Sequence, residues 1–177
     1  IATKTGLASS GCSAQIQSLI TLGIIKKETP LTEGIKSRKT LYTLEDFMFL
    51  LWYRFVRPNL SGIMRGIGET IYEVSVKPQI SHFMGYIFEE ICKQYLYLPQ
   101  IYMTLPFPTG EFGRWWGNNP KKKRQEEIDL MAENGSEAIF GECKWRNEPA
   151  DVDILETLQE RSGLFHYKKQ SYMIFSK

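Results

Sequence analysis

The feature that most constrains the fold is a pair of short alternating segments separated by a tight turn. Residues 127–132 and 138–145 each alternate apolar and polar side chains, and residues 133–136 between them read Glu-Asn-Gly-Ser. An Asn-Gly pair in such a place is typical of a hairpin, because both residues accept the left-handed backbone that tight hairpin turns need. We therefore predict a β-hairpin whose second strand runs from about Ala138 to Trp145.

Alternation along this second strand sorts its side chains onto two faces of the sheet. One face carries Ala138, Phe140, Glu142 and Lys144, and the other carries Ile139, Gly141, Cys143 and Trp145. Asp129 enters from the first strand of the hairpin. We expect Asp129, Glu142 and Lys144 to meet at one place.

Two carboxylates and a lysine suit metal-assisted hydrolysis of a phosphodiester. Carboxylates hold Mg²⁺ or Mn²⁺, and the ion lowers the pKa of a bound water. Asp129 and Glu142 are the predicted ligands, and Lys144 is predicted to assist the attacking water. Asp129 followed by Glu142-Cys143-Lys144 resembles the D...ExK signature of the PD-(D/E)xK nuclease superfamily. The alternative is a surface hairpin with a solvated acid and base.

Composition sets outer limits on the function. The 177 residues are 42% hydrophobic and 24% charged, which is ordinary for a globular protein, and the net charge of +2 does not indicate a nucleic-acid binder. Three widely spaced cysteines argue against a disulfide or zinc framework and favour a reducing cytoplasm. No apolar run reaches membrane-spanning length. Because the chain starts at Ile1 in place of methionine, we expect a fragment of a longer protein.

The first 43 residues have the order of a winged helix-turn-helix. Residues 1–7 read as the end of one helix, residues 9–13 as a turn and cap into a second helix, and residues 24–29 and 39–43 as two strands. In a DNA-binding winged helix the second helix enters the major groove. The predicted nucleic-acid contacts are Ser13, Gln15 and Gln17 on this helix and Lys36 and Arg38 on the wing. Winged helices also serve as protein-binding modules, and the exposed face of this helix is polar rather than basic.

A second resemblance covers nearly the whole chain, in order. Its motifs are Y-x-L-x-D and F-x-F-x-L-W-Y-R-F-V-x-P-N at 42–59, M-G-x-x-F-E-E-I-C at 84–92, F-G-R-W-W at 112–116, E-I-D-L-M-A at 127–132 and G-E-C-K-W-R at 141–146. These resemble the C-terminal region of the archaeal-type ATPase family. The resemblance implies an AAA-type ATPase domain upstream, a winged helix (1–43), a helical connector (44–78) and a nuclease-like domain (79–177). No G-x-x-x-x-G-K-[ST] motif occurs within this sequence.

The nuclease-like domain implied by this resemblance has a restriction-endonuclease-like α-β-β-β-α-β order. Its first helix, predicted at 80–96, contributes an acid to the metal site in many members of the superfamily. The position of Glu89 within F-E-E-I-C favours it for this role by analogy; the alternative is that Glu89 and its neighbour Glu90 are both solvated.

Two segments precede the strand that carries Asp129. Residues 110–117 place two tryptophans between glycines and read as a loop that either presents aromatic rings to bases or seals the core. The following basic loop is predicted to contact phosphate and contains Lys121, Lys122, Lys123 and Arg124. A solvated surface loop is the alternative.

The sequence thus predicts an α/β protein with two functional hypotheses. The first is a metal-dependent DNA endonuclease that pairs as a homodimer and works with the upstream ATPase. The second is a regulatory module that binds DNA or protein without hydrolysis.

Overall fold

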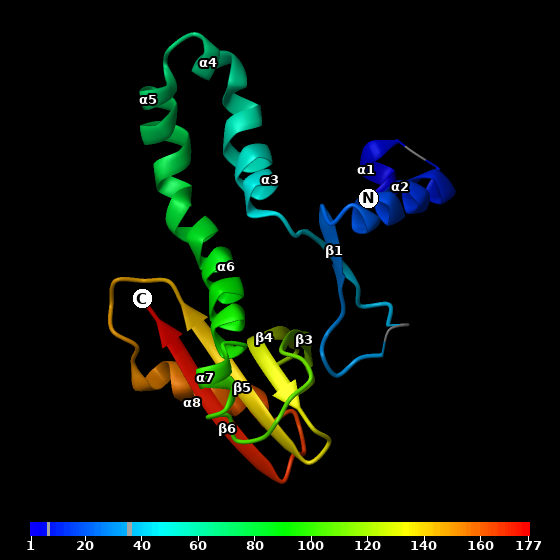
Figure 1. Cartoon of the computed structure of the whole chain (residues 1–177), viewed down its shortest axis with the longest axis vertical. Helices are drawn as coiled ribbons and strands as arrows, with labels where there is room; N and C mark the ends of the chain where they lie inside the picture. Colours follow the sequence, from blue (N-terminus) through cyan, green and yellow to red (C-terminus); the bar gives the residue numbers. More distant parts are fainter. Residues whose placement is uncertain (7, 35–36) are drawn as a thin grey trace. The chain divides into compact units, whose positions relative to one another are not determined.

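The computed structural model describes residues 1–6, 8–34 and 37–177, which form two compact units (Figure 1). Unit 1 comprises Ile1–Glu28 and Arg38–Pro78, and unit 2 comprises Thr29–Ser37 and Gln79–Lys177. The segment 29–37 packs with unit 2, where the backbone N–H of Leu31 donates to the Arg114 carbonyl at 2.9 Å.

Unit 1 begins with two helices and a small sheet. Helix α1 spans Ala2–Thr5 and α2 spans Ser9–Thr21; strand β1 (Ile25–Glu28) pairs antiparallel with β2 (Leu41–Leu44). The predicted order of two helices followed by two strands is therefore confirmed. Lys36, predicted on the wing, lies outside the described residues.

The rest of unit 1 is a series of short helices that folds back on itself (Figure 1). Asp46 begins the first helix, because its side chain accepts hydrogen bonds from the backbone of Met48 and Phe49. Gly66, with φ of 83°, ends one of these helices and separates it from the next. The elements are α3 (Phe47–Leu51), η1 (Trp52–Val56), η2 (Arg57–Asn59), α4 (Leu60–Met64), α5 (Gly68–Ile71) and η3 (Tyr72–Val76).

Unit 2 is built on a mixed four-stranded sheet. The strand order is β3-β4-β5-β6, in which β3, β4 and β5 are antiparallel neighbours and β6 runs parallel to β5. The predicted hairpin is confirmed as β4 and β5, and the α/β class is confirmed. The predicted order of one helix, three strands, one helix and one strand is also confirmed, except that a short helix, α7, follows the first helix. The elements are α6 (Lys77–Leu96), α7 (Pro99–Tyr102), β3 (Gly113–Asn119), β4 (Arg124–Glu133), β5 (Glu137–Lys144), α8 (Val152–Ser162) and β6 (Lys169–Ser176).

Helices cover both faces of this sheet. One apolar cluster joins Cys92 and Leu96 of α6 to strand residues that include Leu130 and Ile139. The other joins Leu158 of α8 to a second set: Trp115, Ile128, Met131, Ala138 and Phe140. The alternation predicted for β5 is therefore confirmed, because its successive residues divide between the two clusters.

The segment predicted as a loop at 110–117 contains strand β3 from Gly113 onward, so that prediction is wrong for most of its length. Trp115 is 8% exposed and packs edge-on against Phe165, with ring centroids 4.9 Å apart. Pairing of Trp115 with Ile128 brings its indole into the α8-side cluster, which favours the core-sealing alternative for this residue.

Gly117 is expected to be required for this packing. A Cβ at position 117 would lie 2.6 Å from the buried ring of Trp115. We expect Gly117→Ala to lower the free energy of unfolding by about 1–3 kcal/mol, because the ring has to leave its place. Gly110→Ala is the matched control, since no heavy atom lies within 4 Å of that Cβ. Equal denaturation midpoints for the two variants would contradict the assigned packing.

Candidate acidic site on the central sheet

A β-bulge in β4 lies at Asp129. Gly113 of β3 pairs with Met131 of β4 and Trp115 pairs with Ile128, so three residue steps on β4 face two on β3. The bulge places Ile128 and Met131 in the same apolar cluster, on the face covered by α8. Bulges redirect side chains and are frequent beside functional sites. Asp129 therefore occupies the irregular part of its strand.

The Asp129 carboxylate is turned toward β5. Its Oδ2 accepts a hydrogen bond of 2.9 Å from the backbone N–H of Cys143, which directly follows Glu142. Backbone pairing between β4 and β5 ends at Leu130 and Gly141, so the aspartate side chain binds β5 just beyond the last backbone pair. Burial and, next, the charge of Glu142 raise the pKa of Asp129 to about 6. The two predicted ligands are thus near neighbours.

Glu142 is surrounded by cations. Its side chain is 6% exposed, and its Oε1 accepts a hydrogen bond of 2.6 Å from Lys144 Nζ. Nη1 of Arg161, on α8, contacts Oε1 at 3.2 Å and Oε2 at 3.0 Å. Both oxygens are therefore engaged, and a divalent ion at Glu142 would lie beside two cations unless it displaces one of these contacts.

Glu89 extends from α6 toward the same strand. Its Oε2 is buried and accepts no hydrogen bond from any residue that the structure describes, and Arg114 Nε lies 3.6 Å from it. Burial, followed by the charge of Asp129, raises the pKa of Glu89 to about 8. A buried carboxylate without a hydrogen bond is costly, and a nearby cation relieves that cost. Glu89 is therefore largely removed from solvent, with 21% of its side chain exposed, and it belongs with the acids of the sheet.

Sequence reasoning missed three charged residues at this site: Arg114, Glu126 and Arg161. Arg114 forms an ion pair with Glu127 as well as lying near Glu89. Arg161 Nε lies 3.3 Å from Glu126 Oε2, so one arginine links β4 to β5. Alternation from Ile128 puts Glu126 on the α8 face and offered a signal for it. Nothing local in the sequence shows that α8 brings Arg161 to this point.

The basic loop is the turn between β3 and β4. All four predicted side chains are exposed: Lys121, Lys122, Lys123 and Arg124. Two of them form ion pairs within unit 2. Lys122 Nζ lies 2.6 Å from Glu160, and Arg124 Nε lies 2.8 Å from Glu126. The loop is therefore linked to the acids through Glu126 and Arg161.

Four predicted contacts of the N-terminal module lie in unit 1, whereas the acids lie in unit 2. Ser13, Gln15 and Gln17 are exposed along α2, and Arg38 is exposed just before β2. Ser13 Oγ donates a hydrogen bond of 2.9 Å to the Ser9 carbonyl, which leaves the hydroxyl oxygen able to accept another.

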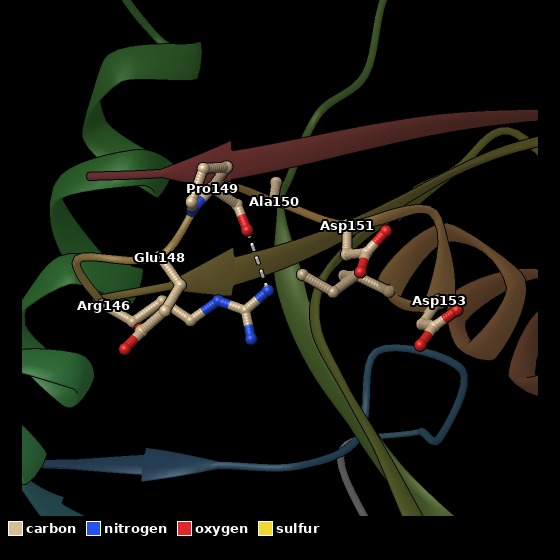
Figure 2. A pocket seen from close by; sticks show the side chains of 7 residues that line it. Arg146, Glu148, Pro149, Ala150, Asp151 and Asp153 are labelled. Carbon is tan, nitrogen blue, oxygen red and sulfur yellow. Dashed lines mark hydrogen bonds between the residues drawn. The ribbon is translucent and has the colours of Figure 1, made fainter.

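A pocket of about 450 Å³ borders the loop that follows β5 (Figure 2). Its charged lining comes from Arg146, Glu148, Asp151 and Asp153. Arg146 Nη2 donates to the Pro149 carbonyl at 3.2 Å, and Asp151 begins α8 by accepting from the backbone of Val152. The acids of the sheet do not line this pocket, whose mixed charge indicates no single class of ligand.

The fit of the acids to a metal ion is partial. Within the described ranges, no group of three or more His, Cys, Asp or Glu side chains is arranged to hold an ion. Glu142 is instead in contact with Lys144 and Arg161. The donor chemistry itself fits a hard cation, because Asp129 and Glu89 are crowded, partly desolvated carboxylates with raised pKa values.

Comparison with known proteins gives one family and one relative. Residues 52–161 match the family described as archaeal and bacterial proteins of unknown function, DUF234. An uncharacterized protein of Methanocaldococcus jannaschii is 34% identical over 179 aligned residues, which cover 97% of this chain and 38% of that protein. The chain thus spans less than half the length of this curated relative. No solved structure matches it.

Among the described residues, no helix combines the length and the apolar character that crossing a membrane requires.

Proposed function

This chain belongs to the DUF234 family of archaeal and bacterial proteins, and we propose that it is a Mg²⁺- or Mn²⁺-dependent DNA endonuclease. The observation that carries the proposal is the hydrogen bond from the Cys143 backbone to Asp129 at a β-bulge. This contact sets an acid of one strand beside the Glu142–Lys144 pair of the next. An acid, a second acid and a lysine two residues later, on adjacent strands, are the elements that metal-assisted phosphodiester hydrolysis uses.

In this proposal the chain's own residues have separate roles. Asp129 and Glu142 hold the ion, and Glu89 supports them from α6. A bound ion supplies charge stabilisation at the phosphate and a water of lowered pKa. Lys144 orients the attacking water and offsets the negative charge that develops on the phosphate. The basic loop between β3 and β4 draws the DNA backbone toward the acids by charge.

The wider architecture follows as part of the same proposal. Unit 2 is a restriction-endonuclease-like domain, as its element order and mixed sheet support. The two helices and two-stranded sheet of unit 1 form a winged helix that contacts DNA. An ATPase domain in the parent chain drives or gates cleavage, and two copies pair to cut both strands. Free Cys12, Cys92 and Cys143 support a reducing, cytoplasmic setting.

One observation favours the second candidate function, a regulatory module that binds DNA or protein without hydrolysis. Glu142, the central acid of the ExK motif, is neutralised by Arg161 and Lys144 rather than left open. A buried carboxylate that is neutralised by two cations does not require a metal ion for the protein to remain folded. In a docking module this network stabilises the sheet, and the exposed basic loop alone contacts the partner.

A cleavage assay separates the two functions. Labelled single-stranded, duplex and branched DNA are incubated with Mg²⁺ or Mn²⁺ and the chain, with Glu142→Ala purified in parallel. We expect metal-dependent cleavage that Glu142→Ala abolishes. Calorimetric titration with Mn²⁺ accompanies the assay, since bound ion without cleavage points to a requirement for the ATPase. Cleavage that survives in Glu142→Ala contradicts the site assignment, and absence of both cleavage and ion binding favours the docking module.

A further inference from the structure

We infer that Arg161 is an internal counterion that occupies the Glu142 carboxylate in the absence of metal and exchanges with the ion when the site is loaded. The inference rests on the proposed function, because it concerns the same metal site. It adds a positioning residue from α8 that acts on the ion through Glu142.

Arg161 contacts the same oxygens of Glu142 that a metal ion would bind. A single nitrogen, Nη1, reaches both carboxylate oxygens of Glu142 at 3.2 and 3.0 Å. A divalent ion bound to this carboxylate takes up the same oxygens, so the guanidinium and the ion compete for them. A buried carboxylate requires a neutralising partner, and Arg161 provides it when no ion is present.

Arg161 also has a second anchor that remains when Glu142 is released. Its Nε lies 3.3 Å from Oε2 of Glu126, whose side chain is 4% exposed. Glu126 Oε1 is held in turn by Arg124 Nε at 2.8 Å. Release of Glu142 therefore leaves neither Arg161 nor Glu126 buried without an opposite charge. The side chain can withdraw from one acid and keep the other.

The two cations on Glu142 are not equivalent in this exchange. Lys144 offers a point charge on a flexible stem, and its side chain is 35% exposed, so water can receive the ammonium. Arg161 is held at 22% exposure between two acids and presents a planar fork. The free-energy cost of binding an ion at Glu142 is therefore set mainly by Arg161.

Titration of the intact chain with Mn²⁺, without DNA, tests this inference. We expect Arg161→Met to bind Mn²⁺ more tightly than the wild type, by about tenfold or more, because the competing charge is gone. Arg161→Lys keeps the charge but loses the fork, and its affinity is expected to lie between the two. Lys169→Met removes an equal charge from β6, where Lys169 forms an ion pair with Glu137 of β5; it is the control and is expected to leave the affinity unchanged.

A gain in affinity is a result that damage to the fold does not produce. If Arg161→Met fails to fold, it is combined with Glu126→Gln, which neutralises the acid that has lost its partner. This double variant is expected to show the same gain in Mn²⁺ affinity. Unchanged or weaker binding in the folded variant overturns the inference.

The outcome is separate from that of the proposed nuclease. Wild-type Mn²⁺ binding that depends on Asp129, with no gain in Arg161→Met, contradicts the exchange and leaves the nuclease intact. A gain in Mn²⁺ binding in a chain that cleaves no DNA supports the exchange and contradicts catalysis. Absence of Mn²⁺ binding in the wild type and the variant overturns both.

Discussion

Asp129→Asn is expected to abolish both ion binding and DNA cleavage, whereas Lys144→Met is expected to abolish cleavage alone. Asparagine retains an oxygen that accepts the Cys143 N–H bond, so the bulge and the hairpin stay in place while the negative charge disappears. Lys144→Met removes the ammonium but leaves the carboxylates. We expect cleavage to be lost together with the ion in Asp129→Asn, and to fall by roughly 10²–10³-fold in Lys144→Met, the range associated with loss of one group that stabilises developing charge.

The measurements are Mn²⁺ affinity by calorimetry and single-turnover cleavage, each with the wild type in parallel. Asp153→Asn, which removes an acid from the first turn of α8 outside the acidic site, serves as the charge-matched control. We expect it to behave as the wild type in both assays. If Asp129→Asn keeps full Mn²⁺ affinity, Asp129 is not a ligand. If Lys144→Met loses the ion as well, the lysine acts on the fold of the site and not on the reaction.

Glu89→Gln is expected to stabilise the metal-free protein at alkaline pH. The folded chain raises the pKa of Glu89 from 4.5 to about 8, chiefly through burial and the charge of Asp129. Because the pKa is raised in the folded state, the Glu89 carboxyl ionises more readily in the unfolded chain. The free energy of unfolding therefore falls as pH rises from about 4.5 to 8, and the full cost is present above pH 8. We expect Glu89→Gln to recover about 2–4 kcal/mol at pH 8.5.

Urea unfolding at pH 5 and at pH 8.5, with a chelator present, measures this effect. The variant is expected to gain much more stability at pH 8.5 than at pH 5, because at the lower pH the wild-type carboxyl is largely protonated. Glu111→Gln, at an exposed glutamate before β3, is the matched control and is expected to follow the wild type. A Glu89→Gln gain that is equal at both pH values would show that burial of a charge is not its cause.

The hairpin and its two faces could be predicted because their causes are local. An Asn-Gly turn and apolar alternation specify β4 and β5, and the register then follows from which residues must be buried. The same alternation predicted that Glu142 and Lys144 share a face, and the ion pair between them at 2.6 Å agrees with this. The helix predicted at 80–96 is present as α6.

The resemblance implied a strand before the hairpin, but the position of that strand, β3, was missed because its cause is tertiary. Glycines and tryptophans at 113–117 have no strand-like alternation of polarity, and the segment becomes a strand because β4 offers it an open edge. Packing of Trp115 against Phe165 then holds it there. Propensity is a weak guide where pairing and burial decide.

The convergence of two acids and a lysine on neighbouring strands follows from local patterns in the chain. Period-two alternation and a tight turn are enough to bring residues 129, 142 and 144 to the same end of a hairpin. The charged groups that surround these residues, and the burial of Glu89, depend instead on packing between distant segments. Docking of α8 brings Arg161 between Glu126 and Glu142, and docking of α6 buries Glu89 beside Asp129. These contacts join segments far apart in the chain, and their strength depends on burial, which no local pattern encodes.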